Sequence, residues 1–120
     1  MRIKIKTHEN DYFLKLMSIL HTIPPFNKLR PQELELYANL LTVNHKLRSI
    51  PFKERNVLIF SYDTKIEISN KMGIKLSGVY NLLSTLRSYK LLEKESLIAK
   101  YTLPKVSELV FLFEDEDTNN

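Results

Sequence analysis

The spacing of apolar residues predicts a chain that is mainly helical after a short extended start. Residues 2–6 (RIKIK) alternate strictly between polar and apolar positions, which predicts a short strand. Residues 11–23 then predict an amphipathic helix, with Asn10 as its N-cap. The apolar residues of this helix recur at helical spacing, at Phe13, Leu16, Met17 and Leu20. The two prolines of IPPFN end the helix, because proline cannot donate a helix hydrogen bond.

Two further helices are predicted before the middle of the chain. Residues 31–43 form the first, with Pro31 at a favourable first position and an apolar stripe formed by Leu34, Tyr37, Leu40 and Leu41. A basic connection, VNHKLRSIP, follows. Residues 52–60 predict a short third helix, whose buried side chains we expect to be Val57, Leu58 and Phe60.

A corner between two helices is predicted at Gly73. The stretch from Thr64 to Glu67 fits a capping box, which predicts that a helix begins there. Its inner face holds Ile68, Ser69 and Met72. Glycine ends a helix in the left-handed conformation without a Cβ penalty, so the helix should stop at Gly73, with Ile74 filling the corner. A second helix is expected from about Ser77, burying Val79, Leu82, Leu83 and Leu86.

This corner resembles the helix-turn-helix family of DNA-binding proteins. The family pattern is a small residue, a glycine four positions later, an adjacent aliphatic, a valine and a further aliphatic, matched here by Ser69, Gly73, Ile74, Val79 and Leu82. The resemblance covers roughly residues 53–104. It implies a mainly α, winged helix-turn-helix fold with extra N-terminal helices and a short β-hairpin wing. The two strands of that wing would carry Leu92, Lys94, Lys100 and Thr102.

Two positions depart from the family pattern. Lys75 stands where such proteins usually carry a capping serine or threonine, so the second helix would be capped late, at Ser77, or begin raggedly. The wing has no glycine at its tip, so residues 93–96 (EKES) would have to make the turn.

The outer face of the second helix is the candidate DNA-reading surface. With Val79 inward, the 100° step per residue directs Ser77, Asn81, Ser84 and Ser88 outward, flanked by Tyr80, Thr85 and Arg87. An amide and a guanidinium in this position are able to read base edges in a major groove. The expected phosphate contacts around the face are Thr64, Lys65, Lys75 and Tyr80, with Lys94 and Lys100 on the wing. A plain solvated face or a protein-interaction helix would look similar.

Charge favours an anionic partner for the body of the chain. The net charge is +4, yet all 18 basic residues and only 10 of the 14 acidic ones precede the acidic tail, which begins at Glu114. We expect one domain over residues 1–113 and a disordered tail over residues 114–120. Residues 104–113 are too apolar to be left exposed, with a spacing that fits a helix or a strand. They would pack back on the domain, or provide an interface for a homo-oligomer or a protein partner.

Other chemistry is not indicated. The sequence has no cysteine, its three histidines are isolated and its two glycines form no phosphate loop, so we expect no enzyme, no metal and no cofactor. No signal peptide or membrane span is indicated, and we expect a cytoplasmic protein, in the host cytoplasm if viral. The 13 lysines against 5 arginines favour a phage-like origin.

The sequence thus predicts a double-stranded DNA-binding protein, a transcriptional regulator that uses residues 77–88 as its recognition helix. The alternative is a protein-interaction or structural module on the same fold, such as a viral assembly or polymerase-binding component.

Overall fold

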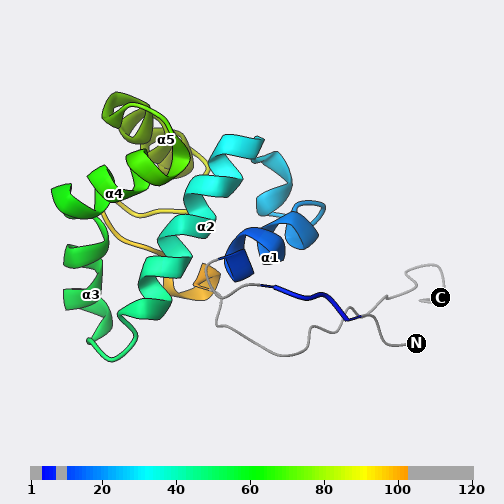
Figure 1. Cartoon of the computed structure of the whole chain (residues 1–120), viewed down its shortest axis with the longest axis horizontal. Helices are drawn as coiled ribbons and strands as arrows, with labels where there is room; N and C mark the ends of the chain where they lie inside the picture. The colour runs from blue at the N-terminus through cyan, green and yellow to red at the C-terminus, as the bar shows by residue number, and fades with distance from the viewer. Residues whose placement is uncertain (1–3, 8–10, 103–120) are drawn as a thin grey trace, which may run out of the picture.

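The computed structural model describes residues 4–7 and 11–102, and this part of the chain is mainly helical (Figure 1). Its α-helices are α1 (Tyr12–Leu20), α2 (Pro31–Lys46), α3 (Phe52–Ile59), α4 (Tyr62–Met72) and α5 (Leu76–Ser88). Two short 3-10 helices are η2 (Phe26–Lys28) and η3 (Ala99–Tyr101). No described helix has the length and apolar character needed to cross a membrane.

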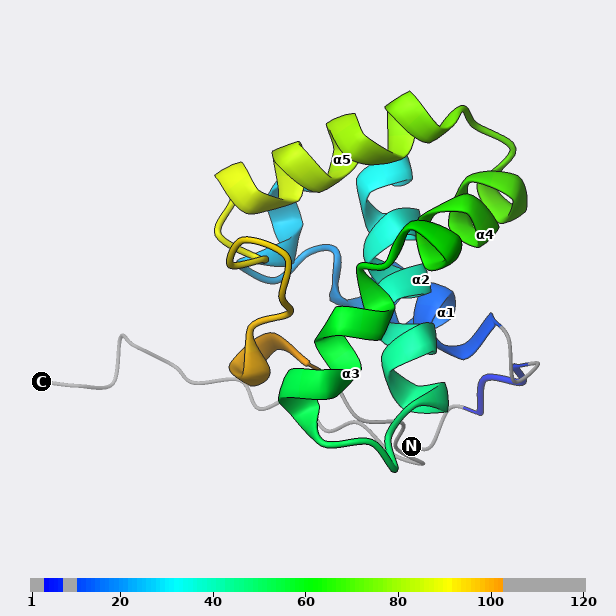
Figure 2. The same cartoon turned by 90° about the vertical axis from the view of Figure 1, so that its left-hand side faces the viewer.

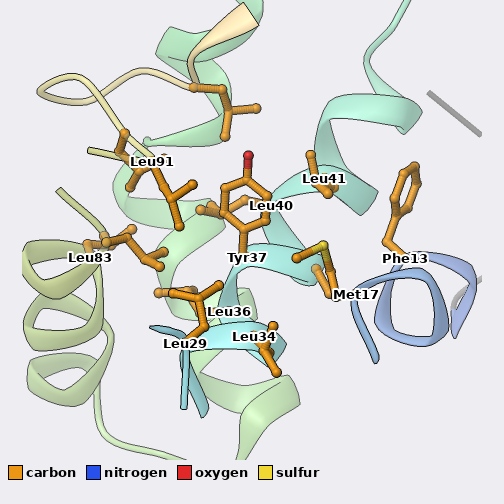
Figure 3. Close-up of a cluster of buried hydrophobic side chains, with 14 of the residues drawn as sticks. Phe13, Met17, Leu29, Leu34, Leu36, Tyr37, Leu40, Leu41, Leu83 and Leu91 are labelled. Carbon is orange, nitrogen blue, oxygen red and sulfur yellow. The ribbon is translucent and has the colours of Figure 1, made fainter. Parts of the chain in front are cut away.

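Helix α2 is the centre of the fold, and the other helices surround it (Figure 1). Most of its residues between Glu33 and Asn44 are buried, so it is a core helix rather than an amphipathic surface helix. Figure 3 shows Tyr37 of α2 between Met17 of α1 and Leu83 of α5. The core therefore joins the N-terminal helices to α4, α5 and the corner between them in one packed unit.

The predicted second helix is confirmed and is three residues longer than expected. Its first turn is closed by the Arg30 N–H, which donates to the Glu33 carboxylate at 3.0 Å. Its far end is held by Arg55, whose Nη1 donates to the buried Asn44 side chain at 2.9 Å. Helix α2 continues two residues past Asn44, to Lys46, before the chain turns toward Pro51.

The range predicted for the third helix is nearly right, but two of its three predicted core residues are wrong. Phe60 is buried, whereas Val57 is 71% exposed and Leu58 is 44% exposed. Ile59 and Asn56 are buried instead. Asn56 is able to occupy the core because both its amide nitrogen and its amide oxygen have a partner: Nδ2 donates to the Phe52 carbonyl at 2.8 Å, and Oδ1 accepts from the Leu97 N–H at 2.9 Å.

The predicted β-hairpin wing is not present as two strands in the described residues. A single antiparallel bridge joins Leu92 to Leu97, and the Glu93 N–H donates to the Ser96 carbonyl at 2.9 Å, so residues 93–96 do make the turn. Beyond the bridge the chain forms η3, and Lys100 lies on it instead of on a strand. The physical reason is that the buried side chains of Leu92 and Leu97 hold this segment against the core. It is not held by a ladder of hydrogen bonds between two strands.

The start and end of the chain also bear on the predictions. A strand was expected at residues 2–6, and the structure describes residues 4–7 of this region. These residues have no regular structure, and Ile5 is 55% exposed. Among the described residues no strand lies beside this segment, so it makes no ladder hydrogen bonds with them. The apolar segment 104–113 and the acidic tail 114–120 lie outside the described residues.

Candidate nucleic-acid interface

The first helix of the corner, α4, begins three residues earlier than the capping-box prediction. Its N-cap is Ser61, whose hydroxyl accepts from the Thr64 N–H at 3.4 Å, so Thr64 already lies inside the helix. The Thr64 hydroxyl donates to the Leu58 carbonyl at 2.8 Å. This hydroxyl thus joins α4 to α3, which argues against its predicted role as a phosphate contact.

The corner itself forms as predicted. Gly73 ends α4 in the left-handed conformation, with φ of 67° and ψ of 32°. The Ile74 N–H donates to the Ser69 carbonyl at 3.0 Å, and the Gly73 N–H donates to the Asn70 carbonyl at 3.2 Å. These two bonds form a Schellman-type ending, which satisfies the last carbonyls of α4 and directs the chain into α5.

Helix α5 begins at Leu76, one residue before the predicted Ser77. Lys75 is its N-cap. A lysine ammonium group cannot accept a hydrogen bond from a backbone N–H, so this residue provides no side-chain cap. Val79, Leu83 and Leu86 are buried, and Leu82 packs against the core while half-buried. The apolar stripe therefore faces α2 and α4 and leaves the opposite side of α5 open.

The outward side of α5 is polar and lies along the outer edge of the molecule (Figure 2). Its exposed residues are Ser77, Tyr80, Asn81, Ser84 and Ser88, all as the helical step predicts, while Thr85 and Arg87 are half-buried. The Thr85 hydroxyl donates to the Asn81 carbonyl at 3.1 Å, and the Ser88 hydroxyl donates to the Thr85 carbonyl at 2.6 Å. Within the described part of the chain, the side chains of Ser77, Asn81 and Ser84 make no hydrogen bond, so their polar groups are available to a ligand.

A run without acidic residues covers most of the corner. Between Glu67 and Glu93 the chain holds no Asp or Glu, and its basic residues there are Lys71, Lys75, Arg87 and Lys90. The three lysines are exposed. Lys71 and Lys90 were not among the predicted contacts. The signal that could have identified them is the absence of acidic residues between Glu67 and Glu93 in the sequence. No carboxylate within this run offsets its positive charge, although Lys71 lies at a cavity that Asp11 and Glu35 also line.

Lys65 does not point outward as predicted. It is buried, and its Nζ donates to Glu95 Oε1 at 3.0 Å and lies 4.8 Å from the centroid of the Tyr80 ring. The ion pair and the ring contact hold α4, α5 and the 93–96 turn together. The ammonium group of Lys65 is therefore engaged within the fold and does not lie on the open surface with the other predicted phosphate contacts, whereas Tyr80 is 42% exposed.

The two lysines predicted for the wing lie in different surroundings. Lys94 is exposed at the 93–96 turn, where its φ of 55° is in the left-handed region. Lys100 is exposed on η3, with its Nζ 4.9 Å from the centroid of the Tyr101 ring. Figure 2 shows η3, in orange, well away from α5, so Lys100 does not join the face of that helix.

Sites for other ligands are small or lacking in the described residues. No cluster of three or more histidine, aspartate and glutamate side chains suited to a metal occurs among them. A cavity of about 30 Å³ between α1, α2 and α4 is lined by Asp11, Glu35, Asn39 and Lys71 among others. A cavity of this size holds about one water molecule, so it is no substrate site.

Comparison with known proteins adds no relative. No protein-family model matches the chain, and neither the curated proteins nor the solved structures include a significant match.

Proposed function

We propose that this protein binds double-stranded DNA with α5 as its recognition helix and acts as a transcriptional regulator. The observation that carries the proposal is the two-sided character of α5. One side is anchored by the buried Val79, Leu83 and Leu86. The other presents short polar side chains along the outer edge of the molecule, where a major groove is wide enough to receive a helix (Figure 2).

The proposal gives each outward group a task. Asn81 reads base edges, because a carboxamide is able to pair with adenine through two hydrogen bonds. Ser77 and Ser84 are short enough to let the helix approach the bases closely. Lys71, Lys75 and Lys90 contact phosphates, which sets the position of α5 without reading sequence.

The winged form of the fold belongs to the proposal as well. The turn at residues 93–96 lies beside the corner through the Lys65–Glu95 ion pair, and Lys94 at this turn is exposed. In the proposed complex this turn takes the place of a wing, and Lys94 contacts the phosphate backbone next to α5.

The test is a salt titration of binding to random-sequence duplex DNA. Each phosphate contact releases counterions, so the affinity should fall with rising salt, and removing one contact should reduce the magnitude of the log–log slope by about 1. Lys75→Gln should show this loss. The matched control is Lys46→Gln, which removes an equal charge from the far end of α2 (Figure 2). No binding at low salt, or an equal effect of the two substitutions, would contradict the proposal.

The second candidate is a protein-interaction module on the same fold, for example a viral assembly or polymerase-binding component. The observation that favours it is the low charge of α5, which holds one arginine, no lysine and no acid. The same titration separates the candidates, because a module that contacts only protein has no salt-dependent affinity for random duplex DNA.

A further inference from the structure

A buried ammonium group lies where α4, α5 and the 93–96 turn meet. Lys65 of α4 is 6% exposed, and its Nζ donates to Glu95 Oε1 at 3.0 Å. The same Nζ lies 4.8 Å from the centroid of the Tyr80 ring, within the range of a cation–π contact. Lysine side chains are almost never buried unless their charge is paired. Here the pairing joins three elements at one nitrogen atom.

Stability by itself does not account for this arrangement. A buried ion pair often stabilises a fold no more than apolar residues of similar volume would. The side chain of Glu95 is also 64% exposed, so water weakens its attraction for the ammonium group. What the arrangement does provide is a preferred orientation of the Tyr80 ring, because the ring is attracted to the cation through its face.

Tyr80 brings a free hydrogen-bond donor to the candidate interface. It is the aromatic residue of α5, it is 42% exposed, and it lies one helical turn from both Ser77 and Ser84 of the outward side. Within the described residues its hydroxyl makes no hydrogen bond. A phenol hydroxyl is able to donate to a phosphate oxygen, a contact that positions a protein on duplex DNA without reading sequence.

We infer that the Tyr80 hydroxyl donates to a DNA phosphate, and that Lys65 is the positioning residue that holds the ring for this contact. The inference rests on the proposed function and deepens it, because it adds an uncharged phosphate contact to the lysines around α5. Lys65 itself does not touch DNA, since it is buried and Glu95 offsets its charge. The buried cation therefore acts on DNA binding through Tyr80.

The first test is Tyr80→Phe, which removes the hydroxyl and keeps the ring that Lys65 contacts. Loss of a hydrogen bond to a charged group should lower the affinity about tenfold, equally for random duplex DNA and for a duplex selected from a random pool. The log–log salt slope should not change, because a phenol releases no counterion. Tyr62→Phe is the matched control, since it removes the same hydroxyl from a tyrosine of α4 that is 62% exposed. It should bind like the wild type.

The second test addresses the positioning role of Lys65. Lys65→Met replaces the ammonium group by an apolar end on an unbranched chain. It should weaken binding to both duplexes without changing the salt slope, and it should cause no further loss when combined with Tyr80→Phe. Thermal melting followed by circular dichroism verifies that each variant folds.

NMR of the free protein tests the ring contact without DNA and without Lys65→Met. The Tyr80 ring should shift the ε-methylene protons of Lys65 upfield, and this shift should vanish in Tyr80→Leu. Unshifted protons in the wild type would overturn the positioning role, as would losses that add in the double variant.

The binding data have equally definite outcomes. Wild-type affinity in Tyr80→Phe, an equal loss in Tyr62→Phe, or a loss confined to the selected duplex would overturn the inference. So would a slope reduced by about 1 in Lys65→Met, because that result assigns a direct phosphate contact to Lys65. Each of these results leaves the proposed function standing, since the wild type still binds. A wild type that binds no duplex at low salt overturns the proposed function and this inference with it.

Discussion

The amide of Asn56 and the backbone of Leu97 are joined across 41 residues, with the Leu97 N–H donating to Asn56 Oδ1 at 2.9 Å. Leu97 is also the residue that bridges to Leu92. Asn56 thus provides the backbone of this segment with a partner that a neighbouring strand would provide in a hairpin. The buried side of α3 therefore holds the turn between Leu92 and Leu97 in place.

Replacing Asn56 should be costly. Asn56→Ala leaves the buried Leu97 N–H without its acceptor, so we expect the free energy of unfolding to fall by about 1–3 kcal/mol. Urea denaturation measures the loss, and hydrogen exchange should show reduced protection of the Leu97 amide. Ser84→Ala on the open side of α5 is the control and should change stability by less than about 0.5 kcal/mol. Unchanged Leu97 exchange in Asn56→Ala would contradict the proposed role of the amide.

The two glycines should respond with opposite signs. Gly73 has φ of 67°, where a side chain is strained even though nothing lies within 4 Å of a Cβ placed there. Gly73→Val should therefore lower the free energy of unfolding by more than about 1 kcal/mol. Gly78 lies within α5, and a Cβ there meets the Ile74 side chain at an ordinary 3.6 Å. Gly78→Ala should raise stability by up to about 1 kcal/mol.

Thermal melting of both variants, with Gly73→Asn as a third, checks this contrast. Asparagine tolerates the left-handed conformation better than valine, so Gly73→Asn should lie between the wild type and Gly73→Val. A melting temperature of Gly73→Val equal to that of the wild type would show that the corner does not depend on positive φ.

Asn81 is the residue on which the proposed base reading depends. Its side chain is exposed on α5, so Asn81→Ala should leave folding unchanged. The affinity for a duplex selected from a random pool should fall by about 1–3 kcal/mol, the range of one bidentate base contact. Binding to random DNA should be nearly unaffected. An equal loss on selected and random DNA would assign Asn81 to backbone contact instead.

Stability should decline at alkaline pH because of Tyr37. Burial raises the pKa of its phenol well above the ordinary value of 10.0, and the neutral hydroxyl donates to the Tyr101 carbonyl at 2.7 Å. Above about pH 10 the unfolded chain releases this proton while the folded chain retains it, so the free energy of unfolding falls as pH rises. The contribution is fully present below pH 10.0 and is lost toward the raised folded pKa.

Tyr37→Phe tests this dependence. It should cost about 0.5–1.5 kcal/mol at neutral pH, because the Tyr101 carbonyl loses its partner. Above about pH 10 its stability should fall less steeply than that of the wild type, since the phenol that titrates is absent. Urea midpoints measured from neutral pH to about pH 11 give both quantities. Parallel curves for the two proteins would remove Tyr37 as the cause of alkaline destabilisation.

Local chemistry was enough to predict the corner and the helices beside it. A left-handed glycine and helical spacing act over a few residues, so Gly73, the buried stripe through Val79 and the outward position of Asn81 follow from the sequence. The start of α4 was harder to predict. Ser61 and Thr64 both suit an N-cap, and only the fold decides between them, because the Thr64 hydroxyl turns to α3.

Outside this corner, only the tertiary structure decided which side chains are buried and which are exposed. Lys65 reads as a surface cation until Glu95, thirty residues later, lies 3.0 Å from its ammonium group. Val57 reads as a core residue until Asn56 takes the inward position with the help of Leu97. Both outcomes depend on a partner far along the chain. The spacing of apolar residues along the sequence predicts which face of a helix is buried. Whether a polar side chain can also be buried depends on a hydrogen-bond partner, and here that partner lies far along the chain.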